Sequence, residues 1–261
     1  MISKKTLISF LNRVITPFVI LIIIAKLYNS IVFIFFKNKD IHFLDLSMLL
    51  YEILGIMIGF FYIYFFKLNF NFYKKANKKF FLYLFLTLLF SYLYTFITQY
   101  RFYNLRPIDF GFSFNSSTFP YLFYFTFVII DPINEELLFR YIIFDYFIKK
   151  NSLIIGIITN SSLFALAHIL VYTGYDFIDF IDFFLMGVTF SVIRLRFGWI
   201  YSVISHSIIN FTGLLFKDKI IDLFILDYFR RNIIFWWIWI VGVLLFLILL
   251  LFLYKTKNKI S

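Results

Sequence analysis

Runs of about 20 mostly apolar residues recur along this chain, and each run is long enough to cross a lipid bilayer as an α-helix. Of the 261 residues, 62% are hydrophobic, whereas a soluble domain is about 45–50% apolar. A single water-soluble core cannot absorb that excess. The sequence therefore predicts an all-α, polytopic transmembrane helix bundle.

The apolar runs divide into eight candidate spans, and no connection between them is long enough for a soluble domain. We therefore expect one integral membrane domain over residues 1–261, with a polar core at about residues 120–216. The eight spans are Val14–Phe36, Leu46–Phe66, Phe80–Gln99, Pro120–Ile148, Ser152–Tyr172, Phe177–Ile193, Trp199–Phe216 and Ile233–Tyr254.

The distribution of charge predicts the orientation in the membrane. With eight spans both termini lie on one side, and the segments on that side hold 15 of the 25 Lys and Arg residues, against 8 in the opposite loops. The acidic loop residues, including Asp176, Asp179 and Asp182, all fall on the opposite side. The positive-inside rule then predicts a multi-pass protein of the cell membrane with both termini in the cytoplasm. Because the net charge of +11 resides in these short loops, we expect the lipid bilayer, not nucleic acid, as the partner.

The fourth span carries charged residues where a membrane helix should be apolar. Asp131, Glu135, Glu136 and Arg140 all lie within it, and each charge at mid-bilayer costs about 2.5–3.5 kcal/mol on insertion scales. They must therefore face the bundle interior or a wet cavity. Glu136 and Arg140 are four residues apart and can pair on one helix face, which leaves Glu135 free to meet other partners or a water.

Two of the three histidines also lie in predicted spans. His168 ends the fifth span, and His206 lies in the seventh, one helical turn before Asn210. A carboxylate can take a proton from water, while imidazoles can bind a metal or stabilise an oxyanion. The chain has no cysteine, so an attacking water is the simplest nucleophile.

Each of these residues also has a purely structural interpretation. A histidine in a membrane helix commonly makes an interhelical hydrogen bond, and the Glu136–Arg140 pair could serve only to hold helices together. Asp131 precedes Pro132 and suits a turn or kink. Phe164 is expected to pack, and His42 is expected in a loop without a role.

Three short motifs together resemble those of the CAAX protease and bacteriocin-processing (CPBP) family of intramembrane proteases. Glu135-Glu136-Leu-Leu-Phe-Arg140 is similar to its Glu-Glu-x-x-x-Arg motif, Phe164-Ala-Leu-Ala-His168 to its Phe-x-x-x-His motif, and His206-Ser-Ile-Ile-Asn210 to its His-x-x-x-Asn motif. Their order and spacing match as well. One departure is Tyr141, where a small residue commonly follows the motif arginine.

The resemblance implies an intramembrane endopeptidase like the type II CAAX prenyl endopeptidases. Such an enzyme would hydrolyse a peptide bond with a glutamate-activated water. Glu135 would be the general base, Glu136 and Arg140 would support the site, and His168, His206 and Asn210 would complete it. The motifs leave open whether a zinc ion is bound; its ligands would be Glu135, His168 and His206.

The substrate and the competing function stay open at this point. The resemblance implies a peptide or protein substrate, either a membrane-associated or lipidated C-terminus or a bacteriocin precursor. The competing interpretation is a non-catalytic multi-span membrane protein, such as a bacteriocin immunity protein or a small transporter, because polar residues in spans also mark transport paths. The two differ in geometry: a protease needs Glu135, His168 and His206 around one water-sized site.

Overall fold

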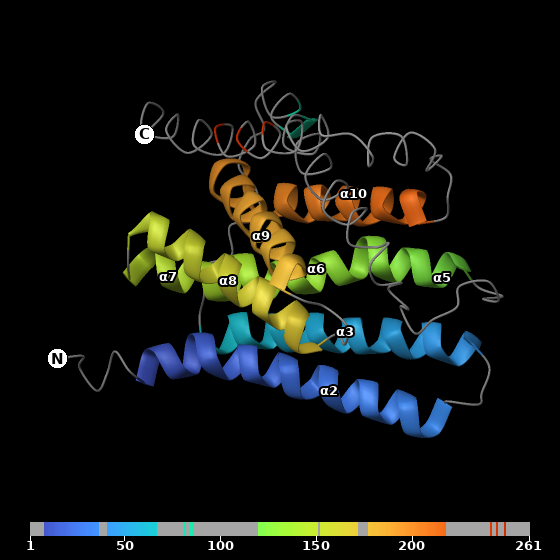
Figure 1. The fold of residues 1–261 in the computed structure, drawn as a ribbon. Helices are drawn as coiled ribbons and strands as arrows, with labels where there is room; N and C mark the ends of the chain where they lie inside the picture. The colour runs from blue at the N-terminus through green and yellow to red at the C-terminus, as the bar shows by residue number, and fades with distance from the viewer. Residues whose placement is uncertain are drawn as a thin grey trace.

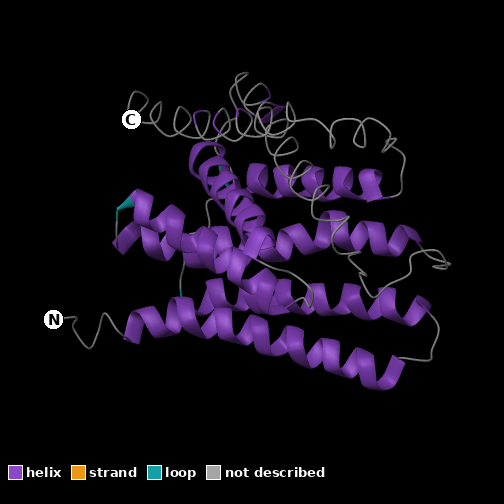
Figure 2. Cartoon of the chain, in the orientation of Figure 1, coloured by secondary structure: helices purple, strands orange, loops and turns teal. Residues whose placement is uncertain are grey.

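The computed structural model describes residues 8–36, 41–66, 120–150, 152–171 and 177–217, together with the isolated positions 81, 84, 85, 241, 244 and 248. All regular secondary structure in these residues is helical (Figure 2). Three of the helical segments, Ile8–Tyr28, Leu46–Phe65 and Leu153–Val171, are long and apolar enough to cross a membrane. The predicted all-α membrane bundle is confirmed.

The two N-terminal spans form a pair of long helices. The first consists of a π-helical turn, η1 (Leu11–Ile15), that runs directly into α2 (Thr16–Phe36), and the second is α3 (Ile41–Phe65). Both are rich in β-branched and aromatic residues, which a lipid-facing helix tolerates because its backbone hydrogen bonds are all made within the helix.

The fourth span is one helical segment from Pro120 to Lys150 that contains two π-helical stretches. It consists of α5 (Pro120–Phe125), the π-helical η3 (Thr126–Ile130), α6 (Asp131–Glu136), the π-helical η4 (Leu137–Ile143) and α7 (Phe144–Lys150). Pro132 lacks the N–H for an ordinary helical bond, yet the backbone around Asp131 stays right-handed helical. The helix therefore continues through Asp131 without the expected turn and widens on both sides of α6, while a kink at this position stays a prediction.

The remaining described helices are α8 (Leu153–Val171), α9 (Phe177–Phe197) and α10 (Trp199–Lys217). A single residue, Gly198, joins α9 to α10. Its φ of 108° lies in a region that side chains disfavour, and its N–H bonds to the carbonyl of Arg194. The tight connection sets α9 and α10 at a sharp angle, visible in Figure 1.

The structure corrects several loop assignments made from the sequence. His42 and Asp45 lie in α3, which begins at Ile41, while Asp179 and Asp182 lie in α9, which begins at Phe177. Asp182 is buried. The spans predicted at Phe80–Gln99 and Ile233–Tyr254 fall outside the described residues apart from the isolated positions, so the count of eight stays a prediction.

The charged fourth span lies at the centre of the bundle. In Figure 1 it runs between α3 on one side and α10 on the other, and α6 contacts both. Helix α9 packs against α8 and α10. The largest buried cluster includes Phe139, Ile143, Phe164 and Phe190, so aromatic side chains from three helices surround the polar residues of α6 and η4.

Candidate active site

Glu135 of α6 meets both membrane histidines. Its Oε1 lies 3.4 Å from Nε2 of His168, and its Oε2 lies 3.7 Å from Nε2 of His206. The three residues come from α6, α8 and α10, which approach one another around this point. The two separations are longer than ordinary hydrogen bonds, so neither ring is hydrogen-bonded directly to the Glu135 carboxylate.

The ring of His168 is fixed by the helix that carries it and by a phenylalanine of α9. Its Nδ1 lies 2.9 Å from the carbonyl oxygen of Phe164, one turn earlier in α8. A carbonyl can only accept, so Nδ1 carries the hydrogen and the neutral ring presents the lone pair of Nε2 to Glu135. The ring of Phe183 stacks against the imidazole at 4.2 Å between centroids.

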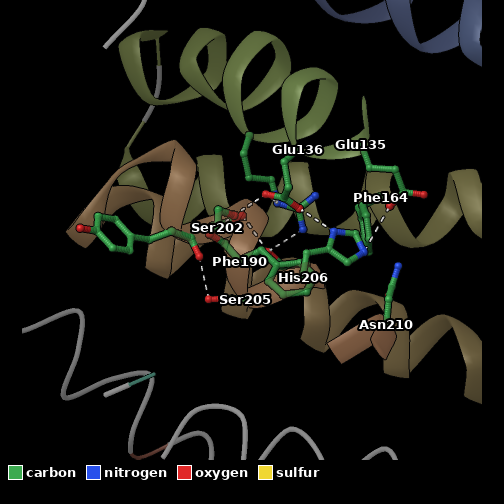
Figure 3. Close-up of polar contacts among 12 residues, drawn as sticks. Glu135, Glu136, Phe164, Phe190, Ser202, Ser205, His206 and Asn210 are labelled. Atoms are coloured by element: carbon green, nitrogen blue, oxygen red, sulfur yellow. Dashed lines mark hydrogen bonds and ion pairs between the residues drawn. The ribbon is translucent and has the colours of Figure 1, made fainter. Parts of the chain in front are cut away.

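His206 is held in the same manner by different groups. Its Nδ1 lies 3.1 Å from Oε1 of Glu136, and a carboxylate paired with arginine accepts from this N–H. Nε2 is thereby directed towards Glu135 (Figure 3). Phe190 stacks on the ring with an interplanar angle of 19° and a centroid distance of 4.5 Å.

Phe183 and Phe190 therefore act as two platforms on one face of α9. They are seven residues, or two turns, apart, and each supports one histidine. The sequence analysis missed both, because a phenylalanine in an apolar helix looks like any other packing residue. The i, i+7 spacing on the helix between the two histidines is the signal that could have found them.

Glu136 and Arg140 form a fully buried pair beside the site. Arg140 Nε lies 3.4 Å from Glu136 Oε2, and both side chains are 0% exposed, whereas Glu135 is 14% exposed. The predicted pairing of Glu136 with Arg140 is confirmed. Arg140 also donates to the carbonyl of Gly187 at 3.4 Å, and its guanidinium carbon lies 4.2 Å from the centroid of the Phe164 ring. The pair can hold the site, and Glu135 is the more exposed of the two carboxylates.

Ser202 of α10 completes the surroundings of Glu136. Its hydroxyl bonds to Oε2 of Glu136 and lies 3.2 Å from the carbonyl of Phe190 (Figure 3). With Arg140 and His206, three groups bind one carboxylate, as a charge in a low-dielectric interior requires. The sequence analysis missed Ser202, although it lies one turn before His206 on the same stripe of α10.

Asn210 lies on that stripe as well, one turn after His206. Its Nδ2 donates to the carbonyl of Phe127 at 2.9 Å, on the π-helical segment η3. Figure 3 shows its amide directed to the side of the site where the Glu135 carboxylate lies. One N–H of the amide is thus used by the backbone, and the second can donate to another group.

The two π-helical segments explain how a single helix can serve so many partners. A π-helical turn contains an extra residue, so it rotates the following side chains relative to an ordinary helix, and such turns are frequent at functional sites. Here η3 precedes α6 and η4 follows it. Phe127, in η3, offers its carbonyl to Asn210 of α10, and Arg140, in η4, pairs with Glu136 of α6.

The site was also compared with the geometry of a metal centre. Among the residues the structure describes, no group of three or more His, Cys, Asp or Glu side chains is arranged to hold a metal ion. Zinc binding by Glu135, His168 and His206 therefore stays a prediction, since the two imidazole lone pairs and the carboxylate are of the chemical type that zinc binds.

Comparison with known proteins places the same segment in a protease family. Residues 117–212 match the family model described as type II CAAX prenyl endopeptidase Rce1-like. Neither the curated proteins nor the solved structures contain a significant match. The family match confirms the resemblance predicted from the three motifs and supports a CAAX-type intramembrane endopeptidase in general terms.

Proposed function

Because residues 117–212 are an Rce1-like segment of the type II CAAX prenyl endopeptidase family, we propose that this chain is an intramembrane endopeptidase. It hydrolyses a peptide bond with a water that Glu135 activates. In this proposal the whole chain forms one multi-pass domain of the cell membrane, with both termini in the cytoplasm.

The observation that carries the proposal is the convergence of Glu135, His168 and His206 from three helices. A transporter could spread polar groups along a route through the membrane, and an immunity protein has no need to direct two imidazole lone pairs at one carboxylate. Here both Nε2 atoms lie within 3.7 Å of Glu135. This arrangement favours a hydrolytic site over either non-catalytic alternative.

The chemistry begins with a water held between Glu135 and the histidines. The carboxylate removes one proton from the water, and the resulting hydroxide attacks the carbonyl carbon of the scissile peptide bond. The tetrahedral intermediate then collapses as the C–N bond breaks, and Glu135 returns the proton to the leaving amine. The products are a carboxylic acid and an amine, and the glutamate ends in its starting form.

The negative charge that develops on the carbonyl oxygen needs hydrogen-bond donors. The second N–H of Asn210 is one, because only the first is taken by the carbonyl of Phe127. The Nε2 atoms of His168 and His206 are acceptors in the neutral rings. While one hydrogen of the water points to Glu135, the other can bond to one of the two rings and orient the water, and a ring that has taken a proton can donate to the oxyanion. Glu136 and Arg140 act indirectly, by holding His206 in place.

The alternative form of this proposal is a metalloprotease with a zinc ion in the same site. A zinc ion on Glu135, His168 and His206 would supply Lewis acidity and lower the pKa of its bound water. The steps above use only water and side chains of this protein, and none of them is routed through a metal.

Two classes of substrate fit the proposal. One is a membrane-associated protein with a lipidated C-terminus, the class named in the family description, and the other is a bacteriocin precursor. Both deliver a peptide bond to a site at membrane depth.

The test is cleavage of an internally quenched peptide by the purified protein in detergent or proteoliposomes. The peptide carries a C-terminal CAAX sequence, with and without a farnesyl group. We expect cleavage of at least one form by the wild-type protein and none by the Glu135→Gln variant. Equal cleavage by both proteins would contradict the proposal, and cleavage of the farnesylated form alone would select the lipidated class.

A further inference from the structure

Helix α3 contributes a buried carboxylate to the neighbourhood of the site, from outside the segment that matches the family. Glu52 is 5% exposed, and its Oε2 accepts a hydrogen bond of 2.6 Å from Nδ2 of Asn134. Asn134 is itself buried and immediately precedes Glu135 in α6. Glu52 is also the only charged residue in the span predicted at Leu46–Phe66, where a charge is costly unless it has a role.

The packing of α3 is shaped around this hydrogen bond. Glu52, Gly55 and Gly59 share one helix face, with spacings of three and four residues. A Cβ on Gly55 would lie 2.4 Å from Nδ2 of Asn134, and a Cβ on Gly59 would lie 2.4 Å from Cδ2 of Leu137. A side chain at either position would therefore displace Asn134 or Leu137, and the carboxamide of Asn134 lies against Gly55 while it bonds to Glu52.

The position of Asn134 gives this contact a consequence for Glu135. Helix α6 is only six residues long and lies between two π-helical segments, whose wider turns do not fix its rotation as firmly as a continuous α-helix would. The hydrogen bond from Asn134 ties one side of α6 to α3. Glu135 lies about 100° further round the helix and faces His168 and His206, so a bond that fixes Asn134 also fixes the direction of Glu135.

We propose that Glu52 is a positioning residue for the reaction: by accepting the hydrogen bond of Asn134, it sets the rotation of α6 and hence the placement of Glu135 between the two histidines. The inference rests on the proposed endopeptidase function. It assigns a role to a residue of α3, which lies outside the matched segment 117–212.

The alternative is that Glu52 only joins two helices, since polar residues commonly hold membrane helices together. The two roles make different predictions for matched variants. Glu52→Leu removes the acceptor at similar size, and Glu52→Gln keeps an oxygen that can accept from Asn134. Asp145→Leu serves as the control, because it breaks another interhelical carboxylate contact, the 2.7 Å bond to Arg194, away from Glu135.

The first measurement is cleavage of the quenched CAAX peptide, with kcat referred to the folded fraction of each variant. We expect Glu52→Leu to lower kcat by about ten- to a hundredfold with KM little changed, since misplacing a reacting group by about 1 Å has effects of that order. Glu52→Gln should recover most of the turnover. Asp145→Leu should lower thermal stability and leave kcat per folded molecule unchanged. Wild-type kcat in folded Glu52→Leu, or a Gln variant as slow as the Leu variant, would overturn the proposal.

A second measurement does not depend on activity. The chain has three histidines, so protein labelled with ¹⁵N-histidine gives three assignable rings, with His168 identified from a His168→Gln variant. The signal of its Nε2 reports the nearby Glu135 carboxylate, and Glu135→Gln gives the value without that charge. We expect Glu52→Leu to shift the signal towards this value, whereas Glu52→Gln and Asp145→Leu leave it in place. An unshifted signal in Glu52→Leu would overturn the inference about Glu52, whether or not the wild-type protein cleaves the peptide. Absence of cleavage by the wild-type protein would instead count against the proposed function.

Discussion

Nδ1 of His206 lies 3.1 Å from Oε1 of Glu136, while Nε2 of the same ring lies 3.7 Å from Oε2 of Glu135. Two consecutive glutamates thus face the two nitrogens of one imidazole. Glu136 is fully buried and bound to Arg140 and Ser202, so it holds the ring. Glu135 is partly exposed and is the one that can meet a water. The two glutamates therefore have different roles: Glu136 supports the site, and Glu135 is the residue to which we assign the chemistry.

Loss of Arg140 should reduce the amount of folded protein as well as activity. Arg140→Ala leaves the buried carboxylate of Glu136 without its cation, and breaking such a pair costs about 3–5 kcal/mol in soluble proteins. Arg140→Lys keeps the charge but not the planar guanidinium over the Phe164 ring. Its stability and activity should therefore lie between those of the wild-type protein and of Arg140→Ala. Melting in detergent, measured beside turnover, checks this, and an Arg140→Ala variant with wild-type stability would show that the pair is not structural.

The two phenylalanine platforms of α9 should affect turnover more than stability. Phe183→Leu and Phe190→Leu keep an apolar side chain but remove the flat surface against His168 and His206. We expect kcat to fall about tenfold in each, because the ring orientation loosens, with a modest decrease in melting temperature. Phe180→Leu is the control, since Phe180 stacks on Phe184 of the same helix. Equal kcat values in all three variants would remove the role assigned to the platforms.

Much of the site could be predicted because a charged side chain in a membrane helix must face a partner or a wet cavity. Glu135, Glu136 and Arg140 in one apolar run had to face partners, and His168 and His206 were the two histidines within the predicted spans. The helices also begin and end close to the predicted span limits, as with Ser152–Tyr172 against α8 (Leu153–Val171). Burial in lipid leaves little choice of secondary structure.

The parts that could not be predicted depend on contacts with no local sequence pattern. Asn134 and Glu52 are 82 residues apart, and nothing in either segment indicates that they meet. The acceptor that fixes His168 is a backbone carbonyl, that of Phe164, which any residue could supply. The π-helical segments η3 and η4 have no local sequence pattern either, and they break the 3.6-residue period on which the assignment of helix faces in the fourth span relied.

The orientation in the membrane is tested by terminal reporter fusions. The bias of 15 basic residues against 8 predicts that reporters at both ends read cytoplasmic. A reporter inserted near Asp176, between α8 and α9, should read external. Opposite readings at the two termini would mean that the number of spans is odd and that the count of eight is wrong.

The role of a metal is tested by chelation. The proposed reaction uses Glu135 and water directly, so activity should survive exhaustive dialysis against a chelator, and the purified protein should contain far less than one equivalent of zinc. Metal content and turnover are measured on the same sample. Loss of cleavage on chelation, restored by added zinc, would contradict the metal-free form and replace it with one in which Glu135, His168 and His206 are ligands.

The central claim is that Glu135 is the base, and the most direct test is turnover by Glu135→Gln. The substitution keeps volume and hydrogen bonding but removes the group that accepts the proton, while the Glu136–Arg140 pair remains to hold the fold. We expect a wild-type melting temperature and a rate lower by at least about 10²–10⁴-fold, the usual contribution of general-base catalysis. A folded Glu135→Gln protein that cleaves the peptide at the wild-type rate would contradict the mechanism.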